Sequence, residues 1–267
     1  MKKNIKENKI LFCILLAAIF IIAIRITGVV FRGLKMEKTA FTSFLVEAIF
    51  AIVAYILLRF AGKQKILGKK ASGLANGLIA GGFVLVLAGM SIIKFFLNEE
   101  NIRNIISNKD VIFFTLEMIL VGVAEEFVFR GAIQNTFYDY FGKDTRNGIY
   151  KSIICSGVIF GIVHIFNILG GVSIKGAIVQ AIYAVIIGCY FGAIYYRSDN
   201  IWSTVFLHAM MDFSALMEAA LLGKGSEIEI VSAYETTNIT ELIWVVIIYL
   251  GLTAFILRKS KVKLPEK

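Results

Sequence analysis

Long apolar segments constrain this 267-residue chain more than any other feature. A run of about 20 apolar residues can cross the hydrocarbon core as an α-helix, and a helix satisfies its own backbone hydrogen bonds in lipid. The chain is 58% hydrophobic, above the usual fraction for soluble domains. It therefore predicts an all-α polytopic membrane protein, a single membrane domain over 1–267, with about eight transmembrane helices. The apolar segments lie at about 10–31, 41–58, 74–97, 111–137, 151–170, 176–196, 200–222 and 240–257.

Basic residues predict the orientation of the chain. Lys2, Lys3, Lys6 and Lys9 precede the first segment, and no clear cleavage pattern follows, so we expect a retained helix rather than a signal peptide. More loop lysines and arginines fall on the side of the two termini than on the other side. This bias predicts a multi-pass protein of the cell membrane with both termini in the cytoplasm. The net charge of +9 is then a topology signal, and nucleic acid is not an expected partner.

Ionisable residues inside three of the apolar segments indicate a functional site. Glu125 and Glu126 lie in the fourth segment, and the only two histidines of the chain, His164 and His208, lie in the fifth and seventh. Asp212 follows His208 in the seventh. Such residues are costly at membrane depth, so they usually face a cavity or a partner. Together they predict a buried reaction centre.

The predicted topology places these groups at similar depths. At about 1.5 Å per residue, Glu125 lies roughly 18 Å from the cytoplasmic end of its helix and His164 roughly 20 Å. His208 lies about 12 Å deep and Asp212 about 18 Å. Three helices therefore bring polar groups into one layer of the membrane.

Spacing along each helix predicts further contacts. His208 and Asp212 are four residues apart and share a helix face. Glu126 and Arg130 have the same spacing, and an ion pair between them would lower the cost of burying both. Glu125 points about 100° away from Glu126 and can face a different neighbour.

Two residues near His164 are predicted to support it. Phe160 lies one turn before His164 and would form a wall of a pocket, and Asn167 lies one turn beyond as a hydrogen-bond partner. Other ionisable residues in apolar segments stand alone, and we expect them to snorkel to a helix end or to pack in an ion pair. These are Arg25, Glu47, Lys94 and Glu117.

Glycine pairs predict close helix packing. Gly157 and Gly161 lie four residues apart in the fifth segment, and Gly188 and Gly192 have the same spacing in the sixth. Small residues at this spacing let transmembrane helices approach closely. The only proline, Pro265, lies in the C-terminal tail, so no span carries a proline kink.

A carboxylate with two imidazoles suits the activation of water. Glu125 would act as general base, because burial favours a basicity suited to that role at neutral pH. His164 and His208 would donate protons to a developing oxyanion or a leaving amine. A zinc ion held by His164, His208 and Asp212, with Glu125 as base, is an alternative that the residues permit but do not require.

Three motifs in the order found here resemble those of a known family. Glu125 to Gly131 reads EEFVFRG and is similar to an EExxxR motif. The segment from Phe160 to His164 is similar to an FxxxH motif. The segment from His208 to Asp212 is similar to an HxxxN/D motif. The chain thereby resembles the CPBP family of CAAX-processing and bacteriocin-processing intramembrane proteases, also called Abi, over a catalytic core at about 110–222.

The resemblance implies an eight-span helical fold with a cavity open toward the cytoplasm, and an endopeptidase activity. Substrates of the eukaryotic branch are prenylated CAAX proteins. Asp212, where that branch has Asn, resembles the bacterial branch, whose members process peptide pheromones or bacteriocins or confer self-immunity. The resemblance implies a catalytic base at Glu125 supported by Glu126 and Arg130, catalytic histidines at His164 and His208, and a polar cluster completed by Asp212.

Two other functions stay open at the level of sequence. One is a catalytically silent regulator or immunity protein that binds a partner membrane protein. The other is a proton-coupled carrier that uses Glu125 and the histidines as a relay. The absence of inverted repeats and of matching broken helices argues against the carrier. The expected partners are the lipid bilayer and a membrane-associated peptide or protein substrate.

Overall fold

Helices make up the whole architecture of the described residues. The computed structural model describes residues 8–69, 71–105, 107–224 and 226–258, and this part of the chain contains no strand. Lys2, Lys3 and Lys6, used above for orientation, lie outside it. The helices are α2 (Lys9–Gly33), α3 (Ala40–Phe60), η1 (Gln64–Gly68), α4 (Ala71–Ala80), α5 (Gly82–Leu97), α6 (Glu99–Arg103), α7 (Asn108–Glu126), η2 (Phe127–Gln134), α8 (Asn135–Phe141), α9 (Arg146–Ile165), η3 (Phe166–Gly170), α10 (Ile174–Ser198), α11 (Ile201–Leu222), α12 (Glu227–Ala233), η4 (Tyr234–Thr236) and α13 (Ile239–Ile256).

The lengths and apolarity of these helices define a polytopic membrane protein. Within the described ranges, six helices are long and apolar enough to cross a membrane, namely α2, α3, α9 with η3, α10, α11 and α13. A bent pair, α4 with α5, makes a seventh crossing if it counts as one span. The predicted count of eight is therefore not confirmed. The remaining predicted segment is helical, but it contains Asp110, Glu117, Glu125 and Glu126.

The third predicted segment is broken rather than straight. The axes of α4 and α5 differ by 70° at Gly81, although no proline is present. A Cβ atom at Gly81 would lie 2.2 Å from Leu207 Cδ1 on α11, so the backbone there packs directly against a side chain. Glycine permits both the bend and this approach.

One helical run carries the acidic motif. Residues 108–141 are helical without interruption, but Phe127–Gln134 form a π-helix between α7 and α8. The sequence predicted a regular α-helix here. π-helical segments often occur at functional sites, and this one starts immediately after Glu126.

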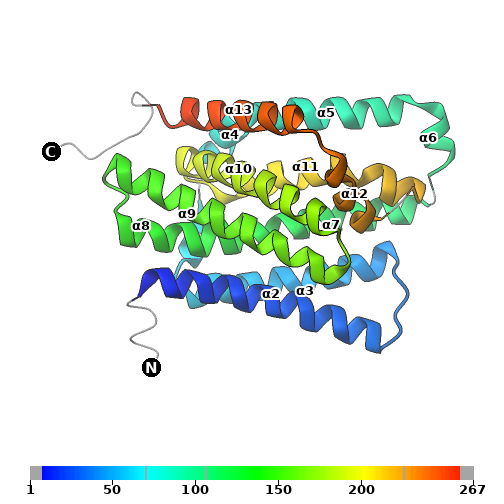
Figure 1. The fold of residues 1–267 in the computed structure, drawn as a ribbon, viewed down its shortest axis with the longest axis horizontal. Coiled ribbons are helices and arrows are strands. Elements are labelled where there is room, and N and C mark those ends of the chain that lie inside the picture. Colours follow the sequence, from blue (N-terminus) through cyan, green and yellow to red (C-terminus); the bar gives the residue numbers. More distant parts are fainter. Residues whose placement is uncertain (1–7, 70, 106, 225, 259–267) are drawn as a thin grey trace.

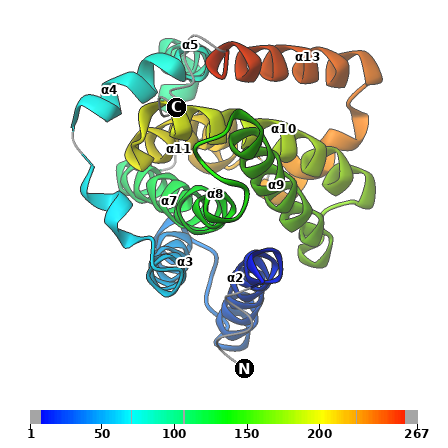
Figure 2. The same ribbon diagram turned by 90° about the vertical axis from the view of Figure 1, so that its left-hand side faces the viewer.

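The helices form a bundle with an inner and an outer set. In Figure 1 the long helices run side by side, and in Figure 2, which looks along them, α7, α8 and α11 lie in the middle. Two thirds (67%) of the most apolar window of α10 is buried, against 6% for α13, so α13 lies at the periphery. The functional motifs lie on α7, α9 and α11, within the bundle.

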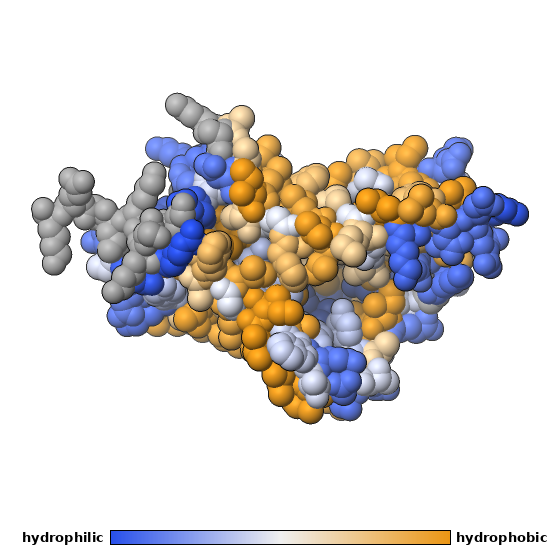
Figure 3. Space-filling model, turned by 90° about the horizontal axis from the view of Figure 1, so that it is seen from above, coloured by the Kyte–Doolittle hydropathy of each residue, from blue (hydrophilic) through white to orange (hydrophobic). Residues whose placement is uncertain are grey.

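The surface shows an apolar band between two hydrophilic ends (Figure 3). The start of α2 and the end of α13 lie at the same end of the bundle (Figure 1). This agrees with an even number of crossings between them, but it does not say which side is cytoplasmic. The hydrophobic band confirms a membrane protein.

Two glycines permit the close helix contacts that form the site. A Cβ atom at Gly122 of α7 would lie 2.7 Å from the Val205 carbonyl oxygen of α11. A Cβ at Gly157 of α9 would lie 2.7 Å from Cys189 Sγ of α10, as the glycine spacing predicted. Gly122 lies one turn before Glu125 and Glu126, so this contact brings the acidic motif against α11.

The connection between α11 and α13 is partly helical, which the sequence did not predict. Ser226 caps α12 in a capping box with Glu229. Val231 of α12 packs with Val172 and Ala177, so α12 is held against the beginning of α10. This connection lies at the end of the bundle opposite Lys9.

Candidate active site

His208 is the centre of a cluster of carboxylates from two helices. Its ring is buried, and its Nδ1 atom lies 2.8 Å from Glu126 Oε1. Its Nε2 atom lies 3.3 Å from Glu125 Oε2 and 3.4 Å from Asp212 Oδ2. The two adjacent glutamates therefore face the two nitrogens of one imidazole. The sequence predicted that Glu125 and Glu126 would face different neighbours, and the structure gives them opposite sides of the same ring.

Glu126 is held by a buried ion pair. Arg130 Nη1 lies 2.9 Å from Glu126 Oε1, and both side chains are almost fully buried. This pair is the one predicted from their spacing. A carboxylate that faces a guanidinium accepts a hydrogen bond, so His208 Nδ1 carries the proton and donates it. His208 Nε2 then points toward Glu125 and Asp212.

Aromatic rings surround the buried part of the cluster. The Arg130 guanidinium lies 4.6 Å from the centre of the Phe160 ring and 5.6 Å from that of Phe191. The His208 ring centre lies 6.1 Å from Phe160 and 5.4 Å from Phe191. Phe160 therefore forms a wall of the site, as predicted. These rings exclude water from Glu126, whereas the Glu125 and Asp212 side chains remain 24% and 23% exposed.

His164 joins the cluster through Phe160. The two ring centres are 4.6 Å apart, and His164 Nδ1 lies 2.8 Å from the Phe160 carbonyl oxygen. A carbonyl only accepts, so Nδ1 carries a proton and Nε2 is free of this bond. His164 is also within electrostatic range of His208 and Asp212. Glu125, Glu126 and Asp212 thus contact His208, and His164 packs against Phe160 beside them. Their catalytic roles stay predictions.

Asn167 has a different partner from the predicted one. Its Nδ2 atom donates to Gln180 Oε1 of α10 at 2.9 Å, and His164 bonds to its own helix instead. The cause is the change from α-helix to 3-10 helix after Ile165, which alters the direction of the next side chains.

A side chain stabilises the π-helix beneath the site. Asn135 Nδ2 lies 2.8 Å from the Arg130 carbonyl, 3.0 Å from the Gly131 carbonyl and 2.8 Å from Tyr195 Oη. A π-helix pairs residues five apart, so its junction with an α-helix leaves carbonyls with poorly placed donors. Asn135 supplies a donor there and links η2 to α10.

Further acidic residues lie around the cluster. The Glu47 carboxylate of α3 is within electrostatic range of Glu125, Glu117 and Glu227. Tyr234 of η4, outside the membrane-spanning helices, has a phenol whose pKa is raised by burial and then by the Asp212 carboxylate. The connection carrying α12 and η4 therefore lies within electrostatic range of the site.

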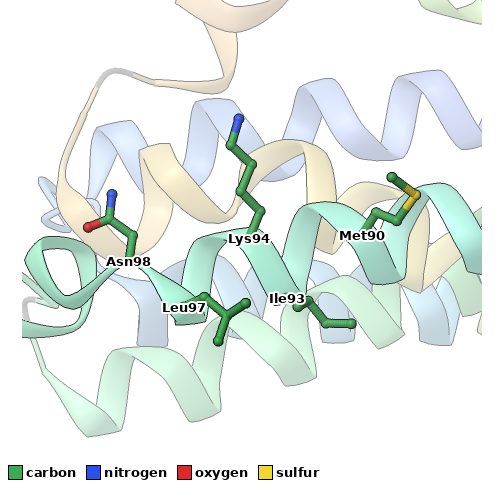
Figure 4. Close-up of a pocket in the computed structure, with 5 residues that line it drawn as sticks. All are labelled: Met90, Ile93, Lys94, Leu97 and Asn98. Atoms are coloured by element: carbon green, nitrogen blue, oxygen red, sulfur yellow. The ribbon is translucent and has the colours of Figure 1, made fainter.

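Two of the solitary ionisable residues lie elsewhere. Arg25 of α2 donates a hydrogen bond to the Phe166 carbonyl, so it supports the segment after His164 rather than pairing with an acid. Lys94 lines a shallow surface pocket of about 450 Å³ on α5, away from the cluster (Figure 4).

The zinc ligands that the sequence permits, His164, His208 and Asp212, stay a prediction. Among the described residues, no group of three or more His, Cys, Asp and Glu side chains is arranged to hold a metal ion. We therefore derive no chemical step through a metal.

Sequence reasoning missed several residues of the site. Phe191 and Asn135 contact Arg130, and Gln180 bonds to Asn167, all from positions without an ionisable side chain. The sequence feature that could have identified Asn135 is its position, five residues after Arg130 in the same helical run. Phe191 and Gln180 come from α10, which carries no motif, so only the packing of α9 on α10 identifies them.

The fold and the site define a polytopic helical membrane protein with a buried carboxylate–histidine cluster. Residues 107–214 of this chain match the family model described as type II CAAX prenyl endopeptidase Rce1-like. The match covers the three motifs and confirms the resemblance to the CPBP family that they predicted. It does not distinguish a bacterial branch. No curated protein and no solved structure matches the chain.

Proposed function

We propose that this protein is an intramembrane endopeptidase that hydrolyses a peptide bond of a membrane-associated peptide or protein. The supporting observation is the arrangement around His208, where Glu126 holds Nδ1 and the mostly buried Glu125 and Asp212 flank Nε2. The family that residues 107–214 match is named for the same class of reaction.

Glu125 is the general base in this proposal. Its carboxylate takes a proton from a water molecule as the water oxygen attacks the scissile carbonyl carbon. When His208 is protonated on both nitrogens, its Nε2 donates to Glu125 Oε2 at 3.3 Å and orients this carboxylate. Asp212 shares the same ring nitrogen and holds the imidazole in place.

The histidines complete the reaction. A protonated His164 donates a hydrogen bond from Nε2 to the oxyanion that forms on the carbonyl oxygen, and it keeps its proton when the intermediate collapses. The carbon–nitrogen bond then breaks, and the proton taken by Glu125 passes to the leaving amine. Overall, water adds a hydroxyl to the acyl carbon and a hydrogen to the nitrogen. The buried Glu126–Arg130 pair fixes His208 and does not touch the substrate.

Peptide cleavage by purified protein tests the proposal. Wild-type protein in bilayer nanodiscs is incubated with membrane-anchored peptides, lipidated and unlipidated near the C-terminus, and products are identified by mass spectrometry. Glu125→Gln is expected to lower the rate at least 100-fold, because it removes the base. Glu117→Gln is the control, since it lies on the same helix but makes no contact with His208 that the structure shows.

Equal cleavage by wild type and Glu125→Gln would refute the endopeptidase. Full complementation of a deletion strain by Glu125→Gln would then favour a silent regulator of a partner membrane protein.

A further inference from the structure

A row of buried polar side chains extends away from His208 along one helical run. Glu126, Arg130, Gln134 and Tyr138 follow one another at intervals of four residues, so neighbouring members lie on the same side of the run. All four residues are at most 4% exposed. The first two hold His208, and the last two continue the row toward the loop between α8 and α9.

Gln134 fastens this row to α10. Its Nε2 atom donates to the Gly192 carbonyl oxygen at 3.0 Å and to Tyr138 Oη at 2.6 Å. One turn earlier on each helix, Arg130 Nη2 lies 3.4 Å from the Gly188 carbonyl oxygen. Two side chains of η2 therefore bond to two glycine carbonyls that are one turn apart on α10.

The missing side chain of Gly192 permits this bond. A Cβ atom there would lie 2.7 Å from Gln134 Oε1 and 3.1 Å from Ile153 Cγ2. The glycine pair of α10, which predicted close helix packing, thus brings α10 near enough to η2 for a side-chain amide to reach a main-chain carbonyl.

Phe191 connects this bond to the active site. It directly precedes Gly192 and is fully buried. Its ring centre lies 5.6 Å from the Arg130 guanidinium and 5.4 Å from the ring centre of His208. The position of α10 against η2 therefore determines how Phe191 covers both groups.

Packing alone does not explain an amide at position 134. The Gln134 Oε1 atom is buried and makes no hydrogen bond to the described residues. A buried polar atom without a partner is costly, whereas an apolar side chain of the same length carries no such cost. The amide supplies one thing that methionine would not, namely the bond to the Gly192 carbonyl.

We propose that Gln134 is a positioning residue of the active site, which acts through Gly192 and Phe191. The inference rests on the endopeptidase function proposed above and adds a residue that does not touch the substrate. The bond from Gln134 fixes α10 against η2, so the Arg130 guanidinium stays aimed at Glu126. The Phe191 ring then keeps water away from this ion pair and from His208.

Kinetics and stability of Gln134→Met test the inference together. For a peptide that wild type cleaves, kcat is expected to fall about tenfold, because the catalytic groups lose their alignment. KM is expected to stay within about twofold, since Gln134 binds no substrate. The midpoint of thermal unfolding is expected to change by less than about 3 °C, because the variant exchanges one unpartnered oxygen, Gln134 Oε1, for another, Tyr138 Oη.

Two control variants separate the bond to α10 from other buried hydrogen bonds. Tyr138→Phe removes the second partner of Gln134 and keeps the bond to Gly192. Ser152→Ala removes a buried hydroxyl that donates to the Gly148 carbonyl of its own helix. Both are expected to keep kcat within about twofold of wild type.

A spectroscopic measurement tests the inference without cleavage. Nitrogen-15 NMR of a His164→Gln background reports His208 alone, because the chain has only two histidines. Gln134→Met is expected to shift or broaden the His208 Nδ1 signal, since the Glu126 carboxylate that accepts its proton is no longer fixed. Tyr138→Phe is expected to leave this signal unchanged.

A merely structural role for Gln134 would give the opposite pattern. The unfolding midpoint of Gln134→Met would fall, while kcat per folded molecule and the His208 signal would equal those of wild type, and this result would overturn the inference. If Gln134→Met does not fold, Gly192→Ala, whose Cβ displaces the amide, is measured against the same expectations. Absence of any cleavage by wild type would overturn the proposed function, and the His208 signal would then decide whether Gln134 holds the cluster.

Discussion

At the scale of single residues, the chain contains an internal comparison of two ion pairs. Glu126–Arg130 and Glu99–Arg103 have the same order and the same spacing on a helix. The first is fully buried, whereas the second is 75–81% exposed. Losing the arginine should therefore cost more stability in the buried pair than in the exposed one, because a buried charge without its partner is far more costly than an exposed one.

Removing each arginine measures this difference. Arg130→Met is expected to lower the free energy of unfolding by about 3–5 kcal/mol, because it leaves Glu126 charged and buried. Arg103→Met is expected to cost at most about 0.5 kcal/mol. Unfolding in mixed micelles with increasing denaturant provides both values. Equal effects would mean that the Glu126–Arg130 pair is hydrated.

Local spacing accounts for the residues of the site that were predicted. Glu126 with Arg130, and His208 with Asp212, lie four apart, so helix geometry alone puts each pair together. The contact between Glu126 and His208 was inferred only as a shared depth, because it joins two helices. The Asn167–Gln180 bond could not be predicted, since it depends on the turn between α9 and α10.

At the scale of elements, the π-helix η2 determines how Arg130 lies under Glu126. Asn135 bonds the Arg130 and Gly131 carbonyls, whereas the next residue, Thr136, bonds only the Ala132 carbonyl of its own helix. Asn135 and Thr136 are therefore neighbours on one helix whose side chains bond to different carbonyls.

Asn135→Ala is expected to reduce kcat about tenfold, because η2 loses the donor that stabilises it and the Glu126–His208 bond is misaligned. Thr136→Val is the control and is expected to keep kcat within about twofold. Both are measured with a peptide that wild type cleaves. Similar rates in Asn135→Ala and wild type would show that η2 forms without this side chain.

The contact of α7 with α11 depends on Gly122. Gly122→Ala places a Cβ 2.7 Å from the Val205 carbonyl, so the helices must separate. We expect a loss of about 1–3 kcal/mol in unfolding free energy together with most of the activity. Gly89→Ala on α5, which meets nothing within 4 Å, should be neutral or stabilising. A fully active Gly122→Ala variant would contradict this account of the helix contact.

The sequence predicted where most of the helices lie, but it did not predict where they bend. Apolarity located the helices, since lipid demands apolar side chains over about 20 residues. It did not reveal the 70° bend at Gly81, because glycine occurs in straight transmembrane helices as well. The bend depends on contact with Leu207, which is distant in sequence.

At the scale of the whole molecule, the two ends of the bundle differ. The loop between α8 and α9 lies at the end where α2 begins, and η4 lies at the opposite end (Figure 1). Charge bias predicts that the first end is cytoplasmic. The resemblance predicts a cavity open toward the cytoplasm, yet Tyr234 and Glu227, in the connection at the second end, are within electrostatic range of Asp212. The experiment to do is therefore one that shows which end of the bundle faces the cytoplasm.

Cysteine labelling tests the orientation. In a variant whose Cys13, Cys155 and Cys189 are replaced by alanine, Glu235→Cys and Asp144→Cys are treated with a membrane-impermeant maleimide. Glu235→Cys is expected to react in intact cells and Asp144→Cys only after permeabilisation. The reverse pattern would place η4 in the cytoplasm.

The central claim is that Glu126 accepts a hydrogen bond from a protonated Nδ1 of His208, so that Nε2 faces Glu125 and Asp212. Nitrogen-15 solid-state NMR of the protein in bilayers measures this directly, and His164→Gln leaves His208 as the only histidine. The account predicts a signal from a protonated Nδ1 in which the proton is shared with a carboxylate, and its disappearance in Glu126→Gln. A His208 ring protonated only at Nε2, unchanged by Glu126→Gln, would contradict the account.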